Sequence, residues 1–416
     1  MNIADTALAI AERLLDPQRV ATSAPSYGVA TLADGLPGTA LLHARLSNID
    51  PVFDAAATAH WAAAAQHAAG APDMGDGIYG AIGGLAASLI LGSPYLPDPD
   101  ATARATDRSV RWLSSRAVDI AAHYTTFVET GDSAIAWHVY DTISGLAGIG
   151  RILLAAMASG HTSAEPGLVA ALTALTTMLT DHGASRPGWW VPTDHHPTVV
   201  ASRLDNTGAA DTGLAHGVAG PLALLSLASL AGQTVTGQET AIRHAVSWLD
   251  LWRAVDHGWP DQVTGRDLDN GSDMVPQGRS AAWCYGVPGI TRSLMHAAQA
   301  LDDARLAETT RADLAQLGAQ HAGWDAAGPT LCHGQAGVLR CATGIDAGVA
   351  EHAAAGVTQS LNPDRPFLVE HLEHGIGHDN PGFLTGAAGV ALALSEVVAL
   401  PARPAATSWD ALLLIT

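Results

Sequence analysis

Two cysteines and one histidine give this sequence its clearest chemical signal. Cys284 and Cys332 each stand two residues before the first glycine of a Gly-x-x-Gly unit, and His333 follows Cys332 directly. Two thiolates and one imidazole suit zinc, and three protein ligands leave a fourth position open, as in catalytic sites. A small residue buried in an apolar core is the plain alternative for either cysteine, but the matched positions favour one zinc per chain. We interpret the third cysteine, Cys341, as core packing.

Four further residues are candidates for chemistry beside these ligands. His216 stands at the position equivalent to His333 and Tyr285, directly before a glycine, so we expect it at the same rim with an acid–base role. Asp141 precedes its glycine by four residues, which suits orientation of His216, substrate binding or a helix cap. Arg279, five residues before the first ligand, would bind a carbonyl or a partner unless it is an ordinary surface residue. Tyr285 would donate a hydrogen bond or simply pack.

The remaining histidine clusters carry a weaker signal. His195 and His196 are adjacent and are not spaced for a site by themselves. His371, His374 and His378 resemble a metal-binding pattern, but they lie in a segment rich in glycine and glutamate. We interpret that segment as a mostly solvated loop with a role as a lid.

A repeated unit must position these side chains. Gly-x-x-Gly returns seven times, with consecutive copies 45 to 72 residues apart, and a fixed motif at such a period indicates repeated supersecondary elements. Paired small residues at a helix start let neighbouring backbones approach closely. The copies begin at Gly35, Gly80, Gly145, Gly217, Gly286, Gly334 and Gly386.

The repeated elements are predicted to be helices. Most copies are followed by Ala/Leu-rich runs that are apolar nearly all round, such as 221–225, which is typical of buried helices. Amphipathic stretches such as 239–249 lie between them. This alternation predicts an all-α fold, a closed α/α toroid of seven inner and seven outer helices, with an open superhelical solenoid as the alternative. The inner helix N-termini would favour anions at one rim.

Composition narrows the function further. The chain has 416 residues, 48% of them hydrophobic, and a net charge of −20, with arginine as its only basic residue type apart from histidine. The acidic balance argues against nucleic acid and anionic membranes as partners, and the missing lysine excludes Schiff-base chemistry. No signal peptide or membrane-length apolar run is recognised, so we expect a cytoplasmic protein. We predict a single domain over 1–416, with long loops around 186–206 and 258–278.

These motifs together resemble those of the lanthionine synthetase C-like family, the cyclases that form thioether rings in lantibiotics. The matching phrases span most of the chain and are highly specific in combination. They are Trp283-Cys284-Tyr285-Gly286-x-Pro288-Gly289, Leu331-Cys332-His333-Gly334-x-Ala336-Gly337, Ala215-His216-Gly217-x-Ala219-Gly220, Tyr140-Asp141 with Gly145-Leu146-x-Gly148, and Gly382-Phe383-Leu384-x-Gly386-x-Ala388-Gly389.

The resemblance implies a helical toroid with one catalytic zinc, held by Cys284, Cys332 and His333. It also implies that His216 and Asp141 are catalytic, with Arg279 and Tyr285 as contributors. The substrate would be a precursor peptide whose Ser and Thr have been dehydrated, and the dehydratase and transporter of the same pathway are further candidate partners. A substrate Cys thiol would add to the alkene, and His216 would protonate the resulting enolate.

Three other readings remain open on the sequence. A relative that adds glutathione to dehydroamino acids would use the same zinc site with another thiol donor. The second is a different toroid enzyme, either a zinc-dependent prenyltransferase or a glycosidase. A glycosidase would use the paired carboxylates Asp76 and Asp141, and the cysteines would then be unexplained. A non-catalytic scaffold for a modification complex is the third.

Overall fold

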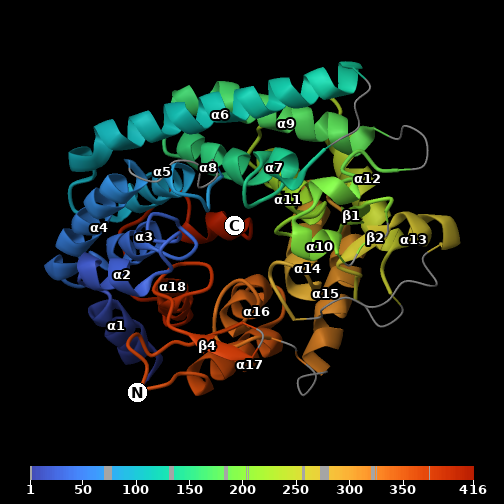
Figure 1. Cartoon of the computed structure of the whole chain (residues 1–416). Helices are drawn as coiled ribbons and strands as arrows, with labels where there is room; N and C mark the ends of the chain where they lie inside the picture. The colour runs from blue at the N-terminus through green and yellow to red at the C-terminus, as the bar shows by residue number, and fades with distance from the viewer. Residues whose placement is uncertain are drawn as a thin grey trace. The chain divides into compact units, whose positions relative to one another are not determined.

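An α-helix begins within each Gly-x-x-Gly unit, and the chain folds mainly into helices (Figure 1). The computed structural model describes residues 2–69, 77–130, 135–181, 186–202, 204, 206–254, 258–271, 281–319, 324, 326–373 and 375–416. The helices that begin within the repeated units are α3 (Leu36–Leu46), α5 (Ile82–Gly92), α8 (Leu146–Ala158), α11 (Ala219–Leu230), α14 (Val287–Ala300), α16 (Gln335–Ala342) and α18 (Ala387–Val397). The predicted all-α class is therefore confirmed.

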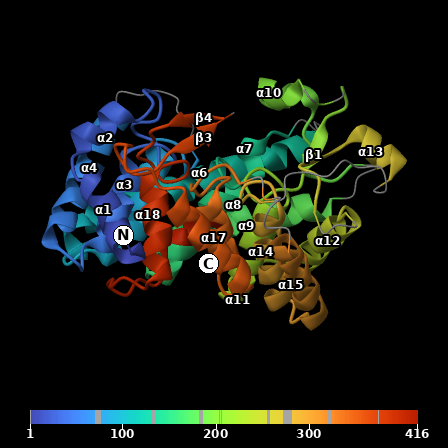
Figure 2. The ribbon, with the colours of Figure 1, turned by 90° about the horizontal axis from the view of Figure 1, so that it is seen from below.

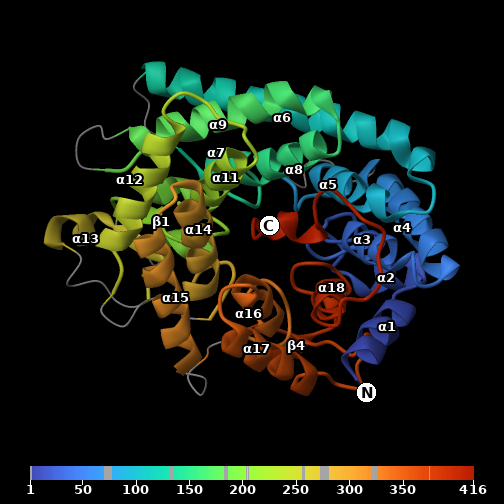
Figure 3. The same cartoon turned by 180° about the vertical axis from the view of Figure 1, so that it is seen from behind.

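A second set of helices alternates with the first along the chain. Its members are α1 (Ile3–Arg13), α4 (Pro51–Ala69), α6 (Ala103–Thr130), α9 (Glu165–Thr180), α12 (Gln238–Leu251), α15 (Ala304–Ala319) and α17 (Ala347–Gln359). Several pack on the preceding repeat helix, as α15 does on α14 (Figure 3), while α1 packs on α18 from the other end of the chain. The remaining α-helices described are short: α2 (Pro17–Ser23), α7 (Trp137–Tyr140), α10 (Thr198–Ala201) and α13 (Gly265–Asn270). Short 3₁₀ helices lie at Ser93–Tyr95, Pro99–Thr102, Thr162–Ala164, Thr193–His195 and Trp409–Leu413.

The two sets of helices differ in burial, as their sequences predict. Helix α11 is buried without interruption from Ala219 to Ser226, so no face of this stretch meets water. Helix α12 is buried only at positions that fall on one face of the helix. These positions are Gln238, Ala241, Ile242, Ala245 and Leu249.

The chain forms two compact units, each built from separate stretches. The first comprises Met1–Leu113, Ala155–Ala164 and Ala326–Leu412, and the second comprises Ser114–Leu154, Glu165–Asp325 and Leu413–Thr416. Helices α6 and α8 have residues in both units. The single domain expected over 1–416 stays a prediction. Among the described residues, no helix combines the length and apolar character that crossing a membrane requires.

Within each unit, the segments that precede the repeat helices are joined by backbone hydrogen bonds. In the second unit the Thr142 N–H donates to the Ala215 carbonyl over 3.0 Å, and the Ala215 N–H donates to the Cys284 carbonyl over 3.1 Å. In the first unit the Cys332 N–H donates to the Leu384 carbonyl, and the Leu384 N–H donates to the Ala33 carbonyl, both over 2.9 Å. Residues at matching repeat positions are therefore held at fixed spacing inside each unit.

Glycine is required where these segments meet the next helix. A Cβ on Gly289, in the first turn of α14, would lie 2.1 Å from the Trp283 carbonyl oxygen and 3.0 Å from the Leu214 Cβ. Gly286 caps the same helix with a φ of 151°, a backbone conformation that other residues rarely adopt. Two of the glycines in the motif thus allow the Cys284 segment to pack closely against its neighbour.

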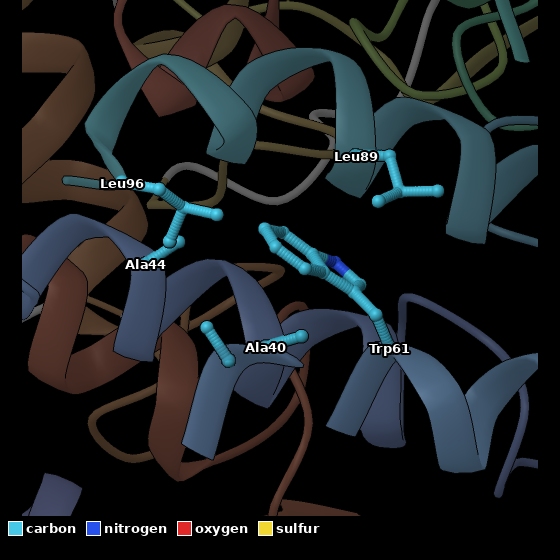
Figure 4. Packing of buried hydrophobic residues seen from close by; sticks show 6 residues of the cluster. Ala40, Ala44, Trp61, Leu89 and Leu96 are labelled. Carbon is cyan, nitrogen blue, oxygen red and sulfur yellow. The ribbon is translucent and has the colours of Figure 1, made fainter. Parts of the chain in front are cut away.

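The core of the first unit is illustrated by the indole of Trp61 in α4. It packs against Ala40 and Ala44 of α3, Leu89 of α5 and Leu96 (Figure 4). Its Nε1–H donates to the Ser88 hydroxyl over 2.8 Å, so the buried polar atom is satisfied. Replacing an indole of this kind by alanine typically costs about 3–5 kcal/mol.

Two short antiparallel strand pairs interrupt the helical pattern. Strand β1 (Ala209–Asp211) pairs with β2 (Gln262–Thr264), so the two segments expected as long loops carry short elements in or beside them. Strand β3 (His371–Glu373) pairs with β4 (Ile376–His378), as Figure 2 shows. The expectation of a simple loop around the three histidines is therefore wrong for the described residues of that segment, since a hairpin runs through it.

Candidate functional site

Asp141 and His216 form the centre of a polar cluster in the second unit. The Asp141 Oδ2 accepts a hydrogen bond from the His216 Nδ1 over 2.6 Å, and the carboxylate is only 1% exposed. Its other oxygen accepts the backbone N–H groups of Ser144 and Gly145, each over 2.7 Å. The sequence left orientation of His216 and capping as alternatives for Asp141. The structure combines orientation of the imidazole with binding of the loop that leads into α8.

The ring of His216 is also held on its face. The indole of Trp137, the first residue of α7, stacks on it with 4.3 Å between ring centroids and 19° between planes. The Tyr285 ring lies 6.1 Å away, centroid to centroid. The imidazole keeps 25% of its surface exposed, and because Nδ1 binds Asp141, Nε2 is the nitrogen available to a reacting group.

The surroundings favour the protonated form of His216. Burial acts to lower the pKa of this imidazole, but the hydrogen bond and negative charge of Asp141 outweigh it, with further contributions from Asp211 and Cys284. The net effect raises the pKa of His216 above its ordinary value. An imidazole that retains its proton near neutral pH is suited to act as a general acid.

Asp211 completes the cluster, and sequence reasoning did not identify it. It ends β1, is fully buried, and accepts hydrogen bonds from the Trp137 Nε1 at 2.8 Å, the Gln262 Nε2 at 3.0 Å and the Tyr285 hydroxyl at 3.4 Å. Burial raises the pKa of Asp211 to about 7, although the donors and the charge of His216 act in the opposite direction. The one available signal was its place five residues before His216, which by itself indicates nothing.

Tyr285 both donates a hydrogen bond and packs, so the two alternatives left by the sequence are combined. Its hydroxyl donates to Asp211, and its ring lies beside His216. Burial, together with the charge of Asp211 and other nearby acidic groups, raises the pKa of Tyr285 well above the usual value. The phenol therefore stays neutral and remains a donor at physiological pH.

Cys284 lies in the same unit, on the segment that leads into α14. Its thiol is not in a disulfide, and the residue is half-buried. The neighbouring Trp283 is fully buried, and its indole N–H donates to the Leu413 carbonyl over 2.9 Å. Trp283 is therefore anchored in the core, while the backbone carbonyl of Cys284 accepts the hydrogen bond from the Ala215 N–H described above.

Cys332 and His333 occupy the matching positions in the first unit. Cys332 is also half-buried and outside any disulfide, and the His333 carbonyl accepts the Ala327 N–H over 2.7 Å. Helix α16 starts two residues after His333, as α14 starts three residues after Cys284. Both thiols thus precede a repeat helix in the same setting, as the sequence predicts. Cys341, further along α16, is fully buried, which confirms its interpretation as core packing.

The histidines of the hairpin divide into two kinds. The prediction of a solvated side chain is wrong for His371, which is 7% exposed because its ring lies 5.1 Å from that of His333 and its Nδ1 lies 3.5 Å from the Thr330 hydroxyl. His378 is exposed, as expected. His374 lies outside the described residues, as do the candidates Arg279 and Asp76.

His196, one of the adjacent pair His195–His196, packs beside the cluster around His216. His196 is buried, its Nε2 lies 3.2 Å from the Val191 carbonyl, and its ring meets that of Trp137 edge-on at 5.2 Å. His195 is exposed. The second unit therefore provides an oriented and partly exposed histidine among hydrogen-bonded polar side chains, with a thiol on the adjoining segment.

Comparisons with known proteins agree with this description. A family model described as "Lanthionine synthetase C-like protein" matches residues 28–413. The nisin biosynthesis protein NisC of Lactococcus lactis subsp. lactis is 24% identical over 263 residues, which cover 62% of this chain and 60% of NisC, so the alignment spans less than two thirds of that relative. A solved structure of nisin cyclase matches with a TM-score of 0.75 at 19% identity, covering 97% of this chain and 96% of the other. This likeness confirms the toroid fold, while the division into seven inner and seven outer helices stays a prediction.

Proposed function

The chain belongs to the lanthionine synthetase C-like family, and from this premise we propose that it is a zinc-dependent lanthipeptide cyclase of the cytoplasm. Its substrate would be a precursor peptide that carries dehydroalanine or dehydrobutyrine together with free cysteines. The reaction adds a cysteine thiol of the peptide to the β-carbon of a dehydrated residue and closes a thioether ring. The observation that carries this proposal is the buried Asp141 carboxylate, which holds Nδ1 of the partly exposed His216 in the unit that also bears Cys284.

The donor set fits a zinc ion. We propose that Cys284, Cys332 and His333 hold it, because both cysteines are half-buried, outside disulfides and placed alike before a repeat helix. Zinc, when bound, would favour the deprotonated form of a coordinated substrate thiol.

The residues of the second unit provide the proton chemistry. As the substrate sulfur bonds to the β-carbon, the electron pair of the alkene moves toward the carbonyl, and the α-carbon must then receive a proton. His216 can deliver it from Nε2, because Asp141 orients the ring and favours its charged form. The thiol gives up one proton and the α-carbon gains one, so the mass of the peptide does not change. Tyr285 and Arg279 are our candidates for stabilising the enolate oxygen.

The proposal can be tested with purified protein and a dehydrated nisin-type precursor peptide. We expect free peptide thiols to disappear while the peptide mass stays constant, and we expect Cys332→Ala to abolish this activity. Cys341→Ala is the matched control. It removes a thiol further along α16 that is fully buried in the core and is not a proposed ligand. Addition of supplied glutathione, seen as an increase in mass, would favour the glutathione-adding alternative. No thiol loss with any dehydrated peptide would refute the cyclase and favour a scaffold.

A further inference from the structure

Asp211 connects three elements of the second unit that surround His216. Its Oδ2 accepts from Trp137 at the start of α7, and its Oδ1 accepts from Gln262 of β2 and from Tyr285. The carboxylate has no exposed surface, so it is out of reach of a substrate peptide. Its effect on chemistry must therefore pass through the side chains that it holds.

Two of those side chains lie against the imidazole. Asp141 fixes the edge of His216 through Nδ1, which leaves the tilt of the ring to be set by what touches its face. That face is covered by Trp137, and the orientation of the indole depends on its Nε1–H bond to Asp211. Tyr285, beside the same imidazole, donates to the other oxygen of Asp211.

We propose that Asp211 is a positioning residue of the acid–base site, acting on His216 through Trp137 and Tyr285. This inference rests on the proposed function of His216 as the proton donor. It also gives a purpose to the β1–β2 pair, which places Gln262 directly opposite Asp211 and supplies the third donor to the buried carboxylate. A group held within a fraction of an ångström by packed neighbours keeps its productive geometry.

The Asp211→Asn variant separates the two functions of the carboxylate. If the amide oxygen takes the place of Oδ1, it still accepts from Gln262 and Tyr285, while the amide NH₂ faces the Trp137 N–H, and two donors cannot bond. Trp137→Phe removes the same hydrogen bond from the other side and leaves a ring that can stack on His216. The two single variants and the double variant therefore form a cycle around one hydrogen bond.

At pH 8, where the pKa of about 7 leaves Asp211 mostly ionised, we expect each single variant to lower kcat by about three- to tenfold with little change in KM. The double variant should be no slower than the slower single variant by more than about twofold, because the bond is already lost. Zinc content should match that of the wild type. The control is Asp267→Asn, which disrupts the capping box of α13 with Thr264 and should leave kcat unchanged.

A second measurement does not depend on turnover. In protein labelled with ¹⁵N-histidine, the His216 resonance, identified by its loss in His216→Gln, should shift in both Asp211→Asn and Trp137→Phe. An unchanged resonance in Asp211→Asn would overturn the inference whether or not the protein cyclises peptides. Independent, additive losses of kcat in the cycle would also overturn it. A wild type that fails to cyclise any dehydrated peptide would instead refute the proposed function.

Discussion

Replacing Asp141 with asparagine tests the coupling between this carboxylate and His216. The amide oxygen can still accept the Ser144 and Gly145 N–H groups, which lie 2.7 Å from one carboxylate oxygen in the wild type. The amide NH₂ then faces the His216 Nδ1, where the wild type has an acceptor at 2.6 Å. The imidazole must therefore give up its Nδ1–H tautomer or its charged form, while the loop before α8 keeps its hydrogen bonds.

The magnitude follows from the kind of hydrogen bond that is lost. A bond to a charged group contributes roughly 1.5–3 kcal/mol, which corresponds to a decrease of about 10- to 150-fold in the rate of a step that depends on it. The pKa of His216 should also fall, because Asp141 is the largest influence that raises it and the burial that lowers it remains. The limb of the pH–rate profile that reports His216 should therefore move to lower pH.

The assay is the initial rate of thiol loss from dehydrated peptide, measured from pH 5 to pH 9. Asp346→Asn is a suitable control, because Asp346 caps α17 through the Val349 N–H and lies far from Asp141 and His216 in the sequence. Both variants should lose at most about 2 kcal/mol of stability, as for the loss of a cap. If Asp141→Asn cyclises peptide within about twofold of the wild-type rate, with an unshifted pH–rate profile, Asp141 does not control the protonation of His216.

Three further predictions concern the frame that holds the site. Gly289→Ala should lower the free energy of unfolding by about 1–3 kcal/mol in urea titrations, because its Cβ would lie 2.1 Å from the Trp283 carbonyl oxygen. The control Gly348→Ala should not destabilise the protein, because the nearest atom would lie 3.4 Å from the added Cβ. The folded state holds the proton of Asp211 up to about pH 7 while the unfolded chain releases it near the ordinary value of 3.8, so this group lowers stability as pH rises. The free energy of unfolding of Asp211→Asn, relative to that of the wild type, should therefore increase as the pH rises from 4 to 8, by at most about 4 kcal/mol. A difference that does not change with pH would contradict this. Asp410→Ala removes the buried partner of Arg340, 2.5 Å away, and should cost about 3–5 kcal/mol in thermal unfolding, whereas a loss below about 1 kcal/mol would show that the pair matters little.

The sequence was sufficient for features that depend on local spacing. Two glycines separated by two residues, before an Ala/Leu-rich run, predicted the start of each repeat helix, because this pattern suits a helix that begins against a neighbouring backbone. The positions of Cys284, Cys332 and His216 followed from the same alignment of repeats. The interpretation of Cys341 as core packing held because an apolar helix surrounds it.

Features that depend on contacts between residues far apart in the sequence could not be predicted. The burial of Asp211 depends on donors from Trp137, Gln262 and Tyr285, which lie between about fifty and seventy-five residues away, and a three-residue strand shows no alternation that would reveal it. His371 was expected in solvent because its neighbours in the sequence are polar. Its burial arises from pairing in the β3–β4 hairpin and from contact with His333, and neither has a local signature.

The zinc content of the purified protein tests whether Cys284, Cys332 and His333 form a metal site. We predict one zinc per chain in wild-type protein prepared without chelators, with the metal lost in both Cys284→Ala and Cys332→Ala. The metal should remain in Cys341→Ala and in His216→Ala, since neither residue is a proposed ligand. If the wild-type protein carries no zinc under these conditions, or if both ligand variants retain it, these residues do not hold a zinc ion.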